Sequence, residues 1–139
     1  MMLTVTAEHV FALPIDDLWA ILGDFGQTGK WSGRPPEACV QEGEGIGALR
    51  TLYIQDGRVI VDRLEAQTDT SYSYSIVTSP LPYKSYRATM SVEPVDAENT
   101  RFHWVGEFEP DGIGDDEAIA FTRNVYAMGI GLMRKTIEG

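Results

Sequence analysis

Alternation of apolar and polar residues predicts β-strands over most of the chain. Residues 70–78 give the cleanest example, because Tyr72, Tyr74 and Ile76 share one face while serines occupy the other. The same reasoning predicts strands at 3–11, 37–43, 46–55, 57–67, 70–78, 84–95 and 100–109. The gaps between them are short and carry turn residues such as Asp56-Gly57. Successive strands should therefore pair as hairpins in an antiparallel meander of about seven strands.

Helical patterns precede and follow this meander. Pro14 suits the first turn of a short helix that Gly23 ends, and residues 24–36 are expected to form a second short helix or a loop. Residues 115–137 contain no proline and carry acidic residues at the start and basic residues near the end, as a long helix prefers.

The apolar residues of this long helix fall on two adjacent stripes. They are Phe121, Val125, Met128 and Leu132 on one, and Ile119, Tyr126, Ile130, Met133 and Ile137 on the other. Together the stripes cover about half the circumference, which exceeds the roughly 100° apolar face of a surface helix. The helix should therefore lie in a concave surface, and a twisted sheet would supply one.

Length and charge narrow the range of functions. The 139 residues suit a single domain spanning 1–139. The formal charge of −10 disfavours binding to nucleic acids or anionic membranes, since both need basic residues. No segment has the roughly 20 apolar residues that a membrane span requires. We therefore expect a soluble, cytoplasmic protein whose partner is a small molecule or another protein, with no nucleic acid and no membrane insertion.

No set of residues typical of catalysis, metal binding or cofactor binding stands out. His9 and His103 are far apart and have no neighbouring ligands at metal-binding spacing. Cys39 is the only cysteine and lies in an apolar strand pattern. Residues 45–47 contain two glycines but no following helix, so they are expected to form a turn rather than a dinucleotide site. We predict no cofactor, no metal and no assigned catalytic residue.

The order of elements, together with five short segments, resembles the START/Bet v 1 superfamily. The segments are GDFGQTGKW (23–31), GIGALRTL (45–52), DRLEAQTD (62–69), SPLPYKSY (79–86) and the end of the last helix around Gly129. They are most similar to the bacterial polyketide cyclase/dehydratase-and-lipid-transport family. The resemblance implies an α+β helix-grip fold, in which a curved antiparallel sheet wraps around the C-terminal helix and leaves a cavity between them.

The resemblance also implies which residues line that cavity. By position they are Lys30, Asp62, Tyr74, Ile76, Leu81, Tyr83, Tyr86, Glu107, Phe121, Val125 and Gly129. Asp62 is in phase with Ile60 and Leu64, so it forms a structural ion pair, lies on a strand face that meets water, or is a polar anchor for a ligand. Lys30 is either solvated or a cation for an acidic or carbonyl-bearing ligand. Tyr72 and Tyr126 are expected to be ordinary tyrosines with hydroxyls in water.

The strand at 100–109 gives two conflicting predictions. Binary patterning places Phe102, Trp104 and Phe108 inward and Glu107 outward. The family resemblance instead places Glu107 toward the cavity and Trp104 away from the cavity. From the sequence we favour this second placement.

Three functions remain open. The leading one is binding or carriage of a small hydrophobic or aromatic molecule. The second is a cyclase/dehydratase-like enzyme in which Lys30, Asp62, Tyr86 and Glu107 supply acid–base chemistry. The third is a structural or interaction module, monomeric or homodimeric, in which the cavity is vestigial and the convex side of the sheet meets a partner. Small residues on the last helix (Ala120, Ala127 and Gly131) would allow close packing in a dimer.

Overall fold

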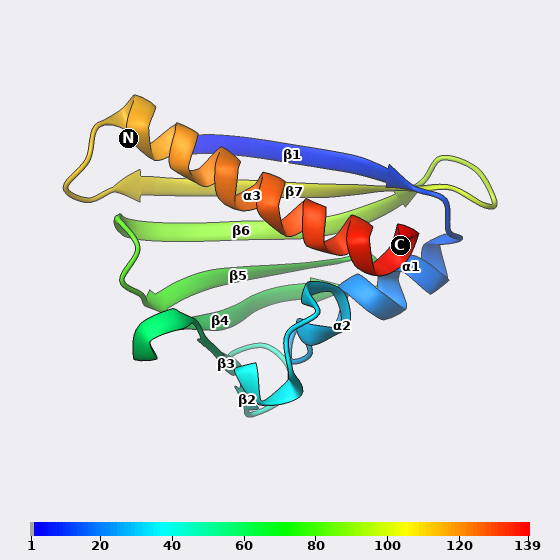
Figure 1. Cartoon of the computed structure of the whole chain (residues 1–139), viewed down its shortest axis with the longest axis horizontal. Coiled ribbons are helices and arrows are strands. Elements are labelled where there is room, and N and C mark those ends of the chain that lie inside the picture. Colours follow the sequence, from blue (N-terminus) through cyan, green and yellow to red (C-terminus); the bar gives the residue numbers. More distant parts are fainter. Residues whose placement is uncertain (1) are drawn as a thin grey trace.

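Seven strands form a single antiparallel sheet in the computed structural model, which describes residues 2–139. The order across the sheet is β1-β7-β6-β5-β4-β3-β2 (Figure 1). The strands are β1 (Leu3–Phe11), β2 (Cys39–Glu42), β3 (Leu49–Tyr53), β4 (Val59–Thr68), β5 (Ser71–Thr78), β6 (Tyr83–Pro94) and β7 (Thr100–Pro110). The predicted meander is confirmed, and β1 joins it beside β7.

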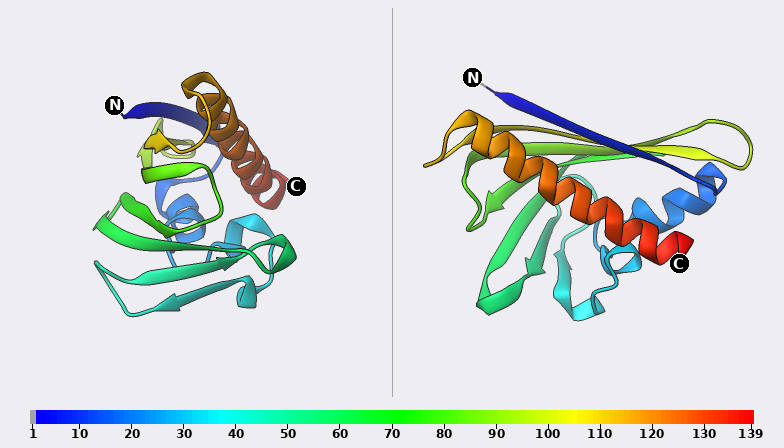
Figure 2. Two further views of the ribbon diagram at one scale, coloured as in Figure 1. Left: turned by 90° about the vertical axis from the view of Figure 1, so that its left-hand side faces the viewer. Right: turned by 45° about the horizontal axis from the view of Figure 1, so that its top comes forward.

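Three α-helices lie on one side of this sheet. They are α1 (Ile15–Leu22), α2 (Gly29–Ser32) and α3 (Asp115–Glu138), and short 3₁₀ turns occupy Pro36–Ala38 and Gln55–Gly57. The sheet curves strongly, and α3 runs obliquely across its concave side, ending near α1 and α2 (Figure 2). This arrangement is the α+β helix-grip fold expected from the sequence. No helix within residues 2–139 is long and apolar enough to span a membrane.

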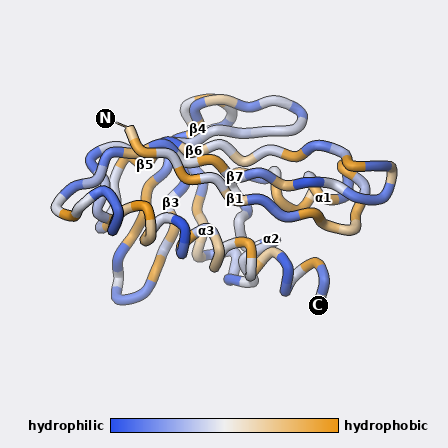
Figure 3. Tube along the Cα trace, turned by 90° about the horizontal axis from the view of Figure 1, so that it is seen from above, coloured by the Kyte–Doolittle hydropathy of each residue, from blue (hydrophilic) through white to orange (hydrophobic). Residues whose placement is uncertain are grey.

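The core follows the inward positions of the strands, but α3 is only partly covered. Apolar and polar residues are interleaved along the strands and along α3, as the hydropathy colouring shows (Figure 3). The buried residues of α3 are Ala118, Thr122, Tyr126, Gly129 and Met133. The predicted stripe that begins with Phe121 is exposed at its three other positions, which are Val125 (36%), Met128 (63%) and Leu132 (41%). The sheet therefore does not fully enclose the helix.

Two glycines permit the close approach of aromatic side chains. An ideal Cβ at Gly129 in α3 would lie 2.7 Å from Cζ3 of Trp104. A Cβ at Gly106 in β7 would overlap the hydroxyl oxygen of Tyr126. The rings of Trp104 and Tyr126 stack with centroids 4.2 Å apart. Both glycines are therefore required by the way that α3 docks on the sheet.

Candidate functional site

A cavity of about 330 Å³ lies between the concave side of the sheet, α2 and α3. Its walls are mainly aliphatic and aromatic. They come from β2 to β7, from α2 and α3, and from the segments after α2 and before β6. Small-molecule sites typically have volumes of roughly 300–1,000 Å³, mostly apolar walls and a few placed polar groups. The cavity therefore has the size and composition of a site for a small ligand.

The charged part of the wall is an ion pair between neighbouring strands. Nε of Arg50 in β3 donates to Oδ2 of Asp62 in β4 at 2.8 Å. The two residues are directly opposite each other in the β3–β4 register. Their side chains are only 4% and 2% exposed. Arg50 also donates through Nη1 to the carbonyl of Phe25 and to the hydroxyl of Tyr72, at 3.0 and 3.2 Å.

Aromatic rings pack against the Arg50 guanidinium and help to keep it charged. Its Cζ lies 4.4 Å from the ring centroid of Phe25 and 4.7 Å from that of Tyr74. Burial acts to lower the pKa of Arg50, but Tyr72 and Asp62 outweigh this effect and hold the pKa above its ordinary value. Burial raises the pKa of Asp62, and the adjacent guanidinium opposes that rise.

Buried phenols form a second polar group along the wall. The hydroxyls of Tyr86 and Tyr126 are hydrogen-bonded to each other, and Nε1 of Trp104 donates to the hydroxyl of Tyr74 at 3.2 Å. Burial raises the pKa of Tyr74, Tyr86 and Tyr126 above the ordinary value for tyrosine. These phenols are therefore neutral hydrogen-bonding groups at physiological pH. The expectation that Tyr72 and Tyr126 have hydroxyls in water was wrong, since both residues are fully buried.

Two buried polar side-chain atoms on the cavity residues have no hydrogen-bond partner among the described residues. They are Oδ1 of Asp62 and Nε1 of Trp31. Buried polar atoms without partners are uncommon, because each one loses its hydrogen bonds to water without replacement. One acceptor and one donor are thus left available on the residues that line the cavity.

Most of the residues that the family resemblance selected do line this cavity. They are Asp62, Tyr74, Ile76, Leu81, Tyr83, Tyr86, Val125 and Gly129. Tyr83 also bonds through its hydroxyl to Oγ1 of Thr122 at 2.7 Å, which joins the start of β6 to α3. Whether these eight residues contact a ligand stays a prediction.

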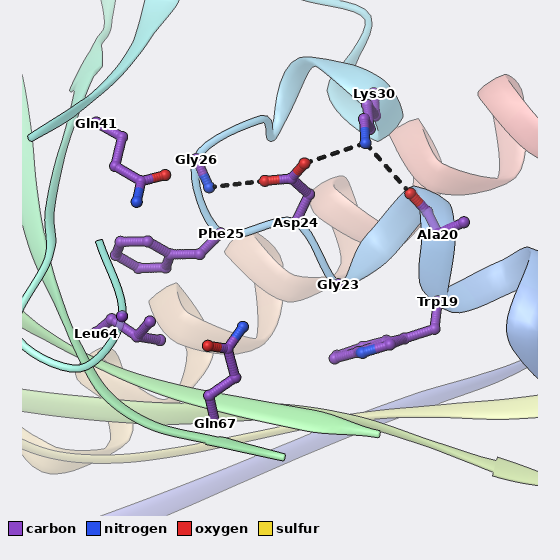
Figure 4. A pocket seen from close by; sticks show the side chains of 11 residues that line it. Trp19, Ala20, Gly23, Asp24, Phe25, Gly26, Lys30, Gln41, Leu64 and Gln67 are labelled. Carbon is purple, nitrogen blue, oxygen red and sulfur yellow. Dashed lines mark hydrogen bonds and ion pairs between the residues drawn. The ribbon is translucent and has the colours of Figure 1, made fainter. Parts of the chain in front are cut away.

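Lys30 is not one of the lining residues, and the structure corrects its predicted placement. Its Nζ pairs with Oδ2 of Asp24 at 3.1 Å and lies 3.5 Å from the carbonyl oxygen of Ala20 (Figure 4). This ion pair borders a separate, more polar depression that is lined by Trp19, Phe25 and Gln67 among others. Because Lys30 is on α2 and turned toward the end of α1, it cannot serve as a cation inside the cavity.

Glu107 and Phe121 also lie outside the cavity lining. Glu107 is exposed, whereas its strand neighbour Phe108 is fully buried, so the binary pattern of β7 was right and the family position was wrong. Trp104 is inward, 5% exposed, and lines the cavity. Phe121 is half-buried and packs edge-on against Tyr83, with centroids 6.2 Å apart.

Several cavity residues were missed from the sequence. Arg50, Trp31, Met90, Met128 and Leu132 line the cavity without having been proposed for it. A signal for Arg50 did exist, because a hairpin centred on Asp56 places residue 50 opposite residue 62. Trp31 had no such signal, since its position depends on how α2 docks against α3.

The histidines and the cysteine have structural environments rather than metal-ligand sets. His9 lies 3.0 Å from Glu138, and His103 lies 2.9 Å from Glu93. The thiol of Cys39 donates to the carbonyl of Gly26 at 3.4 Å. No group of three potential metal-ligating side chains was found within residues 2–139.

Sequence comparison matches residues 2–138 to a family model described as polyketide cyclase / dehydrase and lipid transport. No curated protein matches the chain. Among solved structures, an uncharacterised protein from Bacillus thuringiensis is similar, with 25% identity and a TM-score of 0.86. That likeness covers 99% of this chain and 100% of the other.

Two more distant structures share the fold. A START superfamily protein from Mycobacterium smegmatis has 10% identity and a TM-score of 0.81, covering 97% of each chain. The Zhui aromatase/cyclase from Streptomyces sp. R1128 has 19% identity and a TM-score of 0.72, covering 99% of this chain and 92% of the other. At these identities the likeness supports the fold alone.

Proposed function

Because the chain belongs to the polyketide cyclase/dehydrase and lipid transport family, we propose that it binds a small hydrophobic or aromatic molecule between the sheet and α3. Family and fold fit either ligand binding or a cyclase-like role. The leading form of the proposal is binding or carriage without chemical conversion. The observation that carries it is the apolar cavity of about 330 Å³.

The exposed stripe of α3 supports this proposal. Val125, Met128 and Leu132 all line the cavity, yet each is at least 36% exposed. Apolar area that stays in water forfeits roughly 25 cal/mol per Å² of stabilisation. A hydrophobic ligand in the cavity would cover part of these side chains and recover that free energy on binding.

The volume and the aromatic walls support a compact ligand. The cavity is at the lower end of the range for small-molecule sites, which suits one or two fused rings or a short chain better than a long lipid. Tyr74, Tyr86 and Trp104 offer faces and edges for contact with a ring.

A cavity-filling variant tests the proposal, with its control on the same strand. Ile76→Trp adds a large side chain to the cavity wall, whereas Val77→Trp adds it at a 46% exposed neighbour whose side chain points to the other face. We expect native mass spectrometry of the purified protein, or thermal shifts across a library of hydrophobic compounds, to detect ligands for wild type and Val77→Trp. Ile76→Trp should lose them.

The proposal fails if wild-type protein gives no bound molecule and no thermal shift. It also fails if Ile76→Trp, folded as judged by circular dichroism, binds as well as Val77→Trp does.

An enzymatic role is the alternative, and it would need a smaller set of groups than the sequence suggested. Of the four residues predicted for acid–base chemistry, Asp62 and Tyr86 line the cavity, whereas Lys30 and Glu107 do not. Tyr86 would act as a neutral proton donor, because burial raises its pKa. Turnover of a poly-β-ketone substrate that is lost in Asp62→Asn and Tyr86→Phe would favour this alternative. Unchanged turnover in both variants would reject these roles.

The interaction-module alternative would use the opposite side of α3. Ala127 and Gly131 border a shallow depression against Val5 and Ala7 of β1, and Arg123 and Arg134 lie beside it. A homodimer seen by light scattering that Gly131→Glu converts to monomer would favour this alternative. We propose a monomer or homodimer in the cytoplasm, and the free Cys39 thiol suits a reducing compartment.

A further inference from the structure

One buried oxygen on the cavity lining lacks a hydrogen-bond donor within residues 2–139. It is Oδ1 of Asp62, whose side chain is 2% exposed. The other carboxylate oxygen, Oδ2, accepts Nε of Arg50. A carboxylate oxygen that is removed from water without a donor is destabilising. A molecule that fills the cavity can remove this penalty by donating a hydrogen bond.

The charges near Asp62 decide which kind of molecule fits. Arg50 neutralises the carboxylate, and its Nε and Nη1 donate to groups of the protein, whereas no hydrogen bond from its Nη2 is found within residues 2–139. Arg34, the other charged lining residue, is exposed, and its Nη2 donates to the carbonyl of Tyr53 at 2.6 Å. Lys30 lies in a different depression. The Arg50–Asp62 pair is therefore neutral as a whole, and its unused carboxylate oxygen is an acceptor.

The neighbouring phenols leave this acceptor free. Tyr74 accepts from Nε1 of Trp104, and Tyr72 donates to the sulfur of Met90 at 3.2 Å. Neither hydroxyl bonds to Asp62. Tyr72 and Tyr74 therefore leave Oδ1 of Asp62 without a donor.

We infer that the ligand is a neutral hydrophobic molecule with a hydroxyl or N–H group that donates to Oδ1 of Asp62. The cavity should select such molecules over ethers of the same shape and over hydrophobic carboxylates. This inference rests on the proposed binding function and defines the chemical class of its ligand.

Three naphthalenes of similar shape test the inference by isothermal titration calorimetry at pH 7. They are 2-naphthol, which carries a donor, 2-methoxynaphthalene, which does not, and the anion 2-naphthoate. We expect the naphthol to bind about tenfold or more tightly than the ether, since a hydrogen bond to a charged group is among the stronger ones. The naphthoate should bind more weakly than the naphthol, because its carboxylate has no proton to donate to Oδ1 and adds a second negative charge beside Asp62.

Asp62→Asn reverses the polarity of the group offered to the ligand. The amide oxygen must accept Nε of Arg50, so the amide nitrogen, a donor, takes the place of Oδ1. We expect the preference for the naphthol over the ether to fall about tenfold in this variant. Glu107→Gln makes the same chemical change at an exposed residue outside the cavity lining and should keep the wild-type preference.

The outcomes separate this inference from the proposed function. If none of the three probes binds, the inference fails, and native mass spectrometry and the compound library decide the binding function separately. If all bind but the ether or the naphthoate matches or exceeds the naphthol in wild type, the ligand class is wrong while the binding function holds. An unchanged preference in a folded Asp62→Asn protein would show that another group selects the donor. The wild-type comparison decides the question by itself if that variant does not fold.

Discussion

The docking of α3 on the sheet can be tested with two glycines that are two residues apart on that helix. Replacing a helix-interior glycine by alanine stabilises a helix by about 0.5–1 kcal/mol, because the unfolded chain loses conformational freedom. At Gly131 a Cβ would meet no atom within 4 Å among residues 2–139, apart from its chain neighbours and the backbone of its own helix, so the full gain is expected. At Gly129 the added Cβ would lie 2.7 Å from Cζ3 and 3.0 Å from Cη2 of Trp104.

Trp104 has little room to retreat from that contact. Its ring stacks on Tyr126 at a centroid distance of 4.2 Å, meets the edge of Trp31 at 6.4 Å, and is held by the bond from Nε1 to Tyr74. Overpacking of this kind costs about 1–3 kcal/mol. The helix-propensity gain is common to both variants, so Gly129→Ala should be less stable than Gly131→Ala by about 1–3 kcal/mol.

Urea unfolding followed by far-ultraviolet circular dichroism measures this difference directly, with equal m-values as the check on two-state behaviour. We expect Gly131→Ala to be more stable than wild type and Gly129→Ala to be equal to it or less stable. If Gly129→Ala were stabilised as much as Gly131→Ala, α3 could not pack against Trp104 as described. The position of the helix, and with it the cavity, would then need revision.

Three further perturbations address the buried polar groups. Gly106→Ala should lower the unfolding free energy by about 2–4 kcal/mol, because a Cβ at this position displaces the hydroxyl of Tyr126 and breaks its hydrogen bond to Tyr86. Urea unfolding measures this loss. Arg50→Gln should cost about 3–5 kcal/mol by leaving Asp62 buried without its cation, and a loss below 1 kcal/mol would contradict the ion pair. Burial raises the folded pKa of Asp62 above its ordinary 3.8, so the folded state binds more protons above that pH. The unfolding free energy of wild type relative to Asp62→Asn should therefore be highest below about pH 4 and decline as pH rises through the folded pKa.

In strand β7, the alternation of apolar and charged residues predicted the inward side chains better than the resemblance to the family did. The alternation of Phe102, Trp104 and Phe108 with charged residues correctly predicted which side chains are buried. The family position placed Glu107 inside and was wrong, because period-two geometry fixes the face of every residue once one is fixed. Where the two arguments conflict within a regular strand, the pattern has the more direct physical basis.

The error for Lys30 has a different cause. A lysine in a glycine-rich segment has no periodic pattern to fix its direction, and its long side chain can reach several partners. Here Asp24, six residues earlier, is the nearest carboxylate and forms an ion pair with it. Lys30 is therefore not available as a cationic anchor inside the cavity, and the anchor that we propose instead is Oδ1 of Asp62.

The sequence by itself determined the element order, the seven-strand meander, the long final helix and most of the inward positions of the strands. These features follow from periodicity and turn chemistry, which are local properties of the chain. It also determined that an ionisable residue, Asp62, lies in phase with apolar neighbours.

Only the tertiary structure decided how far the sheet wraps around α3, and therefore which apolar stripe of the helix is left to border a cavity. It also decided that Trp31 lines that cavity and that one oxygen of Asp62 has no donor among residues 2–139. These facts depend on the relative placement of α2, α3 and the curved sheet. Packing among elements distant in the chain sets that placement, and no pattern of single residues encodes it.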